Sequence, residues 1–316
     1  MINCSFLPVF YDYHLSVKEG KPAPVFNDYA ATEDIWLGFY GLGKFETYQF
    51  IYTQCESITQ LQQWMINLKG ETNIQESAAA FAQWTNQLLP DNNTTELTAI
   101  LTETQWENWR QQGYIKVSNL VSEPLCDAVC ELICNRLHVD LAAPETWYSN
   151  HPDWHGLMVQ LYQHESIHAI KSLPAIRQLF AELYGTTSLI ANTEKVSFNP
   201  PETADWKFRH NKLHWDIDFK KEDLFYIQGL VYLNDVPENR GPLTVVPGFN
   251  CEFNEWMKAY SNPGEAQQAM QNTFTGTPVP GKKGDVVLWM QTLPHAASAN
   301  HSNLPRFVQY ISFSKL

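Results

Sequence analysis

The sequence has no long apolar run and few basic residues. No stretch of about 18 apolar residues occurs, so we expect no transmembrane helix. Lys and Arg total 21 against 34 Asp and Glu, which gives a formal net charge of -13. That balance argues against nucleic acid and membrane surfaces as partners, because both bind basic faces. The N-terminus lacks a basic segment leading into an apolar stretch, so no signal peptide is expected.

Cysteine is also scarce, at 6 in 316 residues. The cysteines form no dense disulfide framework, which fits a reducing compartment and a cytoplasmic protein. Cys126, Cys130 and Cys134 recur every four residues and would share one face of a helix. Their spacing matches none of the common iron–sulfur runs, so we expect buried, small apolar side chains.

Apolar residues make up 44% of the chain, which indicates a folded protein. In its first part, the alternating residues Phe45–Phe50 predict strand or irregular structure. A capping box that begins at Ser57 predicts a helix, and a second helix is expected over 74–89. The polar segment Asp91–Thr95 is the best candidate for a domain boundary, near residue 95.

The remainder of the chain begins with helices and ends with strands. A capping box at Thr102 opens a helix that ends at Gly113, and the cysteines lie on the next helix. Further helices are expected around 157–171 and 174–184, and a helical insertion around 252–272. Between these, short runs rich in Val, Ile, Phe and Tyr predict strands, so the order favours an α+β fold or a jelly roll supported by helices.

Three His-x-Asp pairs occur, whereas chance alone gives about 0.4. Only one of them lies in a favourable context, the segment Leu213–Phe219. There Leu, Trp, Ile and Phe alternate with His214, Asp216 and Asp218. A strand would project His214 and Asp216 side by side, so that both could bind one metal ion. The others are His138-Val139-Asp140 and His151-Pro152-Asp153.

A third ligand and a basic residue follow near the end of the chain. His295 comes just after the predicted strand 285–290, and Arg306 opens a final predicted strand. Two His and one carboxylate form the facial triad of non-haem Fe(II) oxygenases. An Arg side chain can bind the distal carboxylate of a dicarboxylate co-substrate.

These residues lie in three blocks that resemble the phytanoyl-CoA dioxygenase-like branch of Fe(II)/2-oxoglutarate-dependent oxygenases. The blocks are LTETQWENWRQQGYIKVSNLV, then HWD with QGLVYLNDVPENRGPLTVVPGFN, and GDVVLWMQTLPHAASANHSNLPRFVQYISF. The resemblance implies a mainly β protein with helices: a double-stranded β-helix (jelly roll) flanked by helices over 96–316. Residues 1–95 match no part of the family and are expected to be an N-terminal extension.

The resemblance also implies an activity and a site. The activity is hydroxylation of an unactivated C–H bond in a small organic or acyl substrate, with release of succinate and CO2. Fe(II), 2-oxoglutarate and O2 are the expected cofactor and co-substrates. A carboxylate ligand favours this outcome over halogenation, for which relatives carry Gly or Ala at that position. The matching residues are the iron ligands His214, Asp216 and His295, the co-substrate residue Arg306, and the pocket residues Tyr232 and Ser298.

Two other readings remain open. His164-Glu165-Ser166-Ile167-His168 matches the H-E-x-x-H pattern of zinc metallohydrolases, on a predicted helix. A non-catalytic jelly-roll binding protein is the other alternative. The motifs identify neither the primary substrate nor the oligomeric state. The terminal Ser314-Lys315-Leu316 has the form of a peroxisomal signal, a second possible location in a eukaryote.

Overall fold

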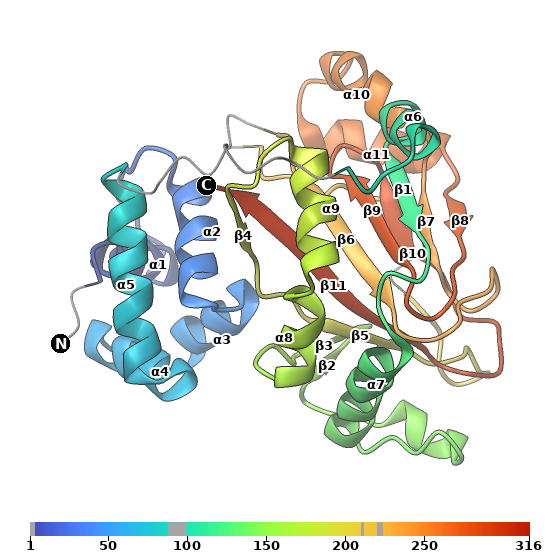
Figure 1. Ribbon diagram of the computed structural model, residues 1–316, viewed down its shortest axis with the longest axis horizontal. Coiled ribbons are helices and arrows are strands. Elements are labelled where there is room, and N and C mark those ends of the chain that lie inside the picture. Colours follow the sequence, from blue (N-terminus) through green and yellow to red (C-terminus); the bar gives the residue numbers. More distant parts are fainter. Residues whose placement is uncertain (1–3, 88–98, 210–211, 220–223) are drawn as a thin grey trace.

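An N-terminal helical unit lies beside a larger β-rich body (Figure 1). The predicted boundary at Asp91–Thr95 lies outside the described residues. The computed structural model describes residues 4–87, 99–209, 212–219 and 224–316.

The helical unit has a hydrophobic core of its own. Phe10, Trp36, Leu61 and Met65 are fully buried within it. The helix that starts after the Ser57 capping residue is confirmed, since the Ser57 side chain accepts a hydrogen bond from the Gln60 backbone. The unit consists of α1 (Leu7–Lys18), α2 (Tyr29–Tyr40), α3 (Lys44–Thr53), α4 (Ile58–Lys69) and α5 (Glu71–Thr85).

The strand predicted over Phe45–Phe50 is wrong, because these residues lie in α3. The Gly43 backbone N–H donates to the Glu46 side chain at 3.3 Å and closes the first turn. The buried residues of this helix, Thr47 and Ile51, are four positions apart. A period of four places them on one helical face, whereas the aromatic residues that suggested alternation lie on several faces.

The body combines flanking helices with antiparallel strands. Its helices are α6 (Glu103–Gln112), α7 (Glu123–Leu137), the 3₁₀-helix η2 (Pro144–Tyr148), α8 (Glu165–Lys171), α9 (Pro174–Tyr184), α10 (Phe249–Lys258) and α11 (Pro263–Thr273). Its strands are β1 (Tyr114–Val117), β2 (Trp154–His155), β3 (Met158–Val159), β4 (Leu189–Ala191), β5 (Val196–Asn199), β6 (Ile227–Tyr232), β7 (Leu243–Val245), β8 (Thr277–Val279), β9 (Val286–Met290), β10 (His295–Ala297) and β11 (Arg306–Lys315).

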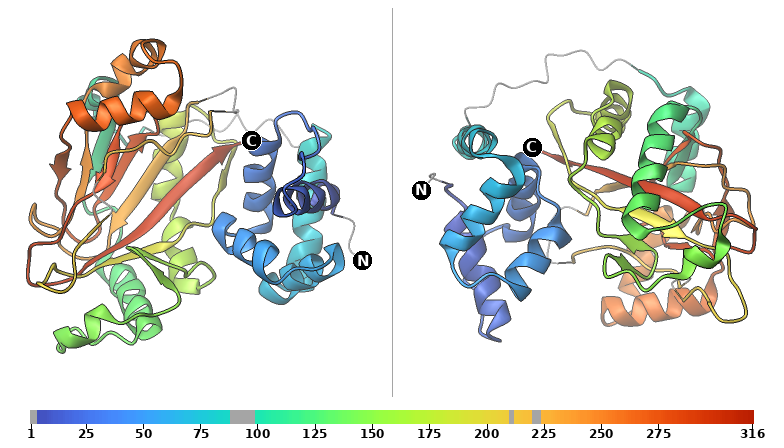
Figure 2. Two further views of the ribbon diagram at one scale, coloured as in Figure 1. Left: turned by 180° about the vertical axis from the view of Figure 1, so that it is seen from behind. Right: turned by 90° about the horizontal axis from the view of Figure 1, so that it is seen from below.

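The described strands form a larger and a smaller sheet. The larger sheet has the order β1-β9-β6-β11-β5-β3-β2, with β4 also paired to β11, and the smaller has the order β10-β7-β8. Side chains alternate between two cores, as strand geometry requires. On β9, Val286 and Leu288 pack against the flanking helices, whereas Val287 and Trp289 pack toward the smaller sheet. Figures 1 and 2 show this jelly-roll body with its helices, which confirms the predicted fold class.

Helix α7 buries its cysteine face, as the four-residue spacing predicted. Cys126 is fully buried, and Cys130 and Cys134 are half-buried against the same core. Burial raises the pKa of the Cys126 thiol to about 11. These thiols therefore stay protonated and contribute packing.

Two further sequence predictions need correction. The segment expected to be helical from 157 forms β3 and then irregular chain, and its helix begins only at Glu165. The segment Leu213–Phe219 keeps its alternation, since Leu213 and Trp215 are buried, but it is not a regular strand. Its pairing is limited to a bridge between His214 and His295.

None of the described helices has the length and apolar character needed to cross a membrane. The terminal residues Ser314 and Lys315 belong to β11, and the Leu316 backbone donates to Ser188 O at 3.0 Å. The peroxisomal signal stays a prediction.

We expect Gly284→Ala to destabilise the protein by about 2 kcal/mol or more, because left-handed strain and a backbone clash add together. Gly284 has φ +85°, and a Cβ there would lie 2.2 Å from Val121 O. Urea unfolding measures the effect. The matched control is Gly20→Ala, at φ +68° with open space around it. Equal losses in the two variants would contradict the role of the Val121 contact.

Candidate metal centre and its cavity

Two histidines are brought together by their own main chains. His214 lies in an irregular segment, and His295 begins β10. The His214 N–H donates to His295 O at 3.0 Å, and the His295 N–H donates to His214 O at 3.1 Å. The ring centroids are 4.6 Å apart. Backbone pairing therefore fixes the separation of the two imidazoles.

Each ring is oriented by a carbonyl two residues earlier. Nδ1 of His214 lies 2.9 Å from Lys212 O, and Nδ1 of His295 lies 3.1 Å from Leu293 O. A neutral ring that carries its proton on Nδ1 presents the lone pair of Nε2, the state that binds a metal. Burial and the neighbouring His295 lower the pKa of His214, although Asp216 opposes them, so His214 is neutral at pH 7.

Asp216 completes the group. Its carboxylate oxygens lie 3.3 Å from His295 Nε2 and 3.8 Å from His214 Nε2. One ligand atom from each of the three residues lies within 4.8 Å of the others. Burial alone would raise the pKa of Asp216, but His295, His214 and an amide donor from Gln228 together hold it well below its usual range. The ionised carboxylate and two Nε2 lone pairs converge, an arrangement that a cation would stabilise.

Gln228 supports this carboxylate from the larger sheet. Its Nε2 donates to Asp216 Oδ2 at 2.9 Å, and its Oε1 accepts a hydrogen bond from Trp289 Nε1 at 3.0 Å. The indole thereby fixes which end of the amide faces Asp216. No sequence motif pointed to Gln228. The alternation of side chains along β6 could have pointed to Gln228, because it places this residue on the same face of the strand as Leu230 and Tyr232.

Arg306 is a buried cation without a carboxylate partner among the described residues. It is 1% exposed. Its guanidinium donates to Gly241 O at 2.6 Å and to Ser197 Oγ at 3.0 Å, and its Nε has no hydrogen-bond partner within the described ranges. A buried charge is stable only when it is paired, so this guanidinium suits an anionic ligand. Ser197 is a second site residue without a signal in the sequence, because β5 meets β11 only through the folded sheet.

A cavity of about 550 Å³ joins these groups. His214, Asp216, His295 and Arg306 all line it, so the structure brings these predicted site residues together. Gln228 of the larger sheet and His295 of the smaller sheet both line it, so residues of both sheets form the cavity.

Tyr232 and Ser298 are not among the cavity-lining residues. The Tyr232 hydroxyl donates to Val279 O at 2.7 Å and accepts from the Leu243 N–H at 3.0 Å, inside the core. Ser298 Oγ donates to Pro242 O at 2.8 Å. Both hydroxyls are thus occupied by backbone groups.

The H-E-x-x-H arrangement does not form on a helix. His164 precedes α8 in an extended conformation and caps it, with Nδ1 accepting from the Ser166 N–H at 3.2 Å. His168 lies inside the helix, and burial lowers its pKa to about 4. The two rings therefore do not share a helical face. Among the described residues, the group that could hold a metal is His214, Asp216 and His295.

A jelly-roll protein with a His–Asp–His group in a cavity lined by both of its sheets is the class that this fold and site define. The model of the phytanoyl-CoA dioxygenase (PhyH) family matches residues 109–308, more than half of the sequence. The chain belongs to the phytanoyl-CoA dioxygenase family.

Similar proteins agree with this assignment. A relative from Dictyostelium discoideum, provisionally named a phytanoyl-CoA dioxygenase, is 22% identical over 257 residues, which cover 65% of this chain and 73% of the relative. The solved non-haem α-ketoglutarate-dependent carbocyclase SnoK from nogalamycin biosynthesis is 18% identical, with a TM-score of 0.51, and the match covers 68% of this chain and 85% of SnoK. EctD from S. alaskensis with bound Fe is 18% identical, with a TM-score of 0.52, and the match covers 72% and 82%. At these identities the solved structures establish the fold.

Proposed function

We propose that the chain is an Fe(II)- and 2-oxoglutarate-dependent oxygenase that hydroxylates a C–H bond of a small organic or acyl substrate. One observation carries the proposal. The convergent His214, Asp216 and His295 line the same cavity as the guanidinium of Arg306, which has no carboxylate partner among the described residues. The first group suits Fe(II), and the second suits the distal carboxylate of 2-oxoglutarate.

The family and the similar structures support this choice of cofactor and co-substrate. EctD from S. alaskensis has been solved with Fe and, separately, with 2-oxoglutarate and 5-hydroxyectoine. SnoN is described as a non-haem α-ketoglutarate-dependent epimerase. Since a carbocyclase and an epimerase share this fold, hydroxylation is the part of the proposal that needs its own product analysis.

The residues of this chain have distinct tasks. His214 and His295 supply neutral Nε2 ligands, held by carbonyls on their Nδ1 sides, and Asp216 supplies the anionic ligand, held by Gln228. Arg306 orients the co-substrate through its distal carboxylate. When bound, iron and 2-oxoglutarate supply the oxidation: one atom of O2 ends in succinate as CO2 is lost, and the other ends in the hydroxylated substrate. The apolar walls, including Leu230 and Leu243, exclude water from the reacting groups.

An anaerobic titration of the metal-free protein with Fe(II) and 2-oxoglutarate tests the proposal. We expect a visible absorption band from iron-to-keto-acid charge transfer in the wild type and its loss in His214→Ala. The matched control is His168→Ala, which removes a histidine of the H-E-x-x-H segment and should leave the band intact. Absence of a band in a folded wild type would overturn the proposal and favour a non-catalytic jelly-roll binding protein.

Gln228→Leu is expected to weaken Fe(II) binding about tenfold while leaving it detectable, because Asp216 loses the donor that orients it. Isothermal titration of the metal-free protein under anaerobic conditions measures the affinity. Gln309→Leu provides the control, since this buried glutamine of the same sheet bonds Ile167 O and is absent from the cavity lining. An unchanged affinity in Gln228→Leu would remove Gln228 from the support of the centre.

A further inference from the structure

The N-terminal helical unit forms part of the cavity that contains the candidate metal centre. Leu37, Lys44 and Phe45 of α2 and α3 line the same space as His214 and Asp216. Figure 2 shows the unit beside the C-terminal end of β11 from two further directions. The extension, which had no assigned role in the sequence, therefore supplies a wall of the site.

Close contacts hold this wall in place. A Cβ on Gly43 would lie 2.6 Å from Tyr162 Cδ1, so α3 begins where only glycine fits against the body. Gln163 of the body donates to Gly41 O at 3.0 Å and to a Glu46 side-chain oxygen at 2.9 Å. Steric fit and paired polar groups together indicate a fixed wall.

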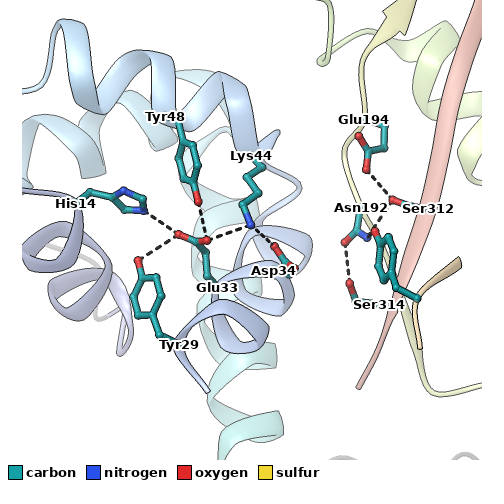
Figure 3. Close-up of polar contacts among 11 residues, drawn as sticks. His14, Tyr29, Glu33, Asp34, Lys44, Tyr48, Asn192, Glu194, Ser312 and Ser314 are labelled. Atoms are coloured by element: carbon teal, nitrogen blue, oxygen red, sulfur yellow. Dashed lines mark hydrogen bonds and ion pairs between the residues drawn. The ribbon is translucent and has the colours of Figure 1, made fainter. Parts of the chain in front are cut away.

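Opposite this wall, the body presents a carboxylate held by a chain of hydrogen bonds (Figure 3). Glu194 Oε1 accepts from Ser312 Oγ at 2.7 Å, and Ser312 Oγ accepts from Asn192 Nδ2 at 3.1 Å. The same amide donates to the Tyr226 hydroxyl at 2.8 Å. All four side chains line the cavity. The chain of bonds uses Oε1 of Glu194, and no side chain in the described part of the protein hydrogen-bonds to Oε2, which is left for a ligand.

Glu194 forms no ion pair with the described residues. The ammonium of neighbouring Lys195 lies 3.7 Å from the centroid of the Phe45 ring. Burial raises the pKa of Glu194, Ser312 and Lys195 oppose the rise, and the carboxylates of Asp34 and Asp216 add to it. A cationic ligand group would offset both the desolvation of the Glu194 carboxylate and its repulsion by the carboxylates of Asp34 and Asp216.

The facing wall carries a network of charged and polar side chains (Figure 3). Lys44 Nζ lies 2.8 Å from Asp34 Oδ1 and 3.2 Å from Glu33 Oε2, so its charge is shared by two carboxylates. Glu33 also accepts from the Tyr48 hydroxyl at 2.7 Å and lies 2.7 Å from His14 Nε2. The ammonium of Lys44 is therefore held by two carboxylates, of which Asp34 lines the cavity.

We propose that the space between α2, α3 and the Glu194 side of the body is the primary-substrate site, and that Glu194 binds an ammonium group of the substrate. The inference rests on the proposed function for the reacting end, where the cavity reaches His214 and Asp216. Asp34 adds negative potential from the helical wall, and the Phe45 ring offers an apolar side. The predicted substrate class is a small organic amine or another protonated nitrogen compound.

Calorimetry on the full chain with two probes of equal shape tests this assignment. Benzylammonium is expected to bind the wild type about tenfold or more tightly than benzyl alcohol, the preference that one charged hydrogen bond provides. Glu194→Gln should remove the preference and leave the affinity for benzyl alcohol unchanged. Glu255→Gln, an exposed position on α10, is the matched control.

A second pair of variants checks the wall without changing the carboxylate. Phe45→Ala should weaken the binding of both probes, whereas Phe26→Ala, on the same unit but outside the cavity lining, should not. Equal or undetectable binding of the two probes by the wild type, or a preserved preference in Glu194→Gln, would overturn the inference. The charge-transfer titration separates the two proposals. A normal absorption band with iron and 2-oxoglutarate, together with no preference for benzylammonium, would refute this inference alone. A preference for benzylammonium without the absorption band would refute the proposed function alone.

Discussion

Asp216→Ala is expected to weaken Fe(II) binding about 100-fold or more and to abolish the absorption band with 2-oxoglutarate. The substitution removes the anionic member of the three-ligand group and leaves two neutral imidazoles. It also leaves the Gln228 amide without its acceptor. Losing an outer partner of a metal ligand already costs about 10- to 100-fold, so losing the ligand itself should cost at least the upper end of that range.

Asp218→Ala is the matched control for this variant. Asp218 lines the same cavity two residues along the chain but is not part of the ligand group. Anaerobic titration calorimetry gives the affinity, and circular dichroism verifies the fold of both proteins. Iron binding at wild-type strength in Asp216→Ala would refute the assignment of the centre.

The second large effect is expected at Arg306. Arg306→Leu should weaken 2-oxoglutarate binding by about 100-fold while Fe(II) binding persists, because two charge-assisted hydrogen bonds of about 1.5 kcal/mol or more each are lost. The buried guanidinium has no carboxylate partner among the described residues that could compete for it. The 2-oxoglutarate dependence of the absorption band measures the loss.

Two further variants separate binding from folding. Arg306→Lys keeps the charge but loses the planar fork, so an intermediate affinity is expected. Arg240→Leu removes an arginine that bonds Ser302 and Asp235 O, outside the cavity lining, and should leave the co-substrate affinity unchanged. Equal losses in Arg306→Leu and Arg240→Leu would indicate a general structural effect and contradict the role of Arg306.

Local patterns predicted the parts of this fold that depend on local forces. Ser57 and Thr102 both cap the starts of helices, Thr102 with the full capping box and Ser57 through its side chain alone, since the cap satisfies backbone donors within four residues. The alternation around His214 correctly separated buried from cavity-facing side chains. It did not produce a regular strand, because this segment pairs with β10 only at His295.

Features that depend on distant parts of the chain could not be predicted in the same way. Gln228 reaches Asp216, and Ser197 reaches Arg306, only after the strands have paired. The helical unit matched no family pattern, and its contribution of Lys44 to the cavity depends on how it docks. In the H-E-x-x-H segment the sequence matches a metal-binding motif that the fold does not form, because His164 lies one residue ahead of the helix.

Strand β11 contributes several residues to the cavity lining. Arg306 is the first residue of β11, and Tyr310 lies farther along the strand. Ser312, which donates a hydrogen bond to Glu194, lies six residues from Arg306, or about 20 Å in an extended chain. These positions are all even-numbered and line the cavity, whereas Phe307 packs into the core against the flanking helices. Inserting or deleting one residue before Arg306 would offset β11 against its neighbours, and a slip of one position would turn every one of these side chains to the opposite face. The residues at the co-substrate end and at the substrate end of the cavity therefore depend on one pairing register of β11. Insertions or deletions within this strand keep both sets of side chains in the cavity only when they change its length by two residues.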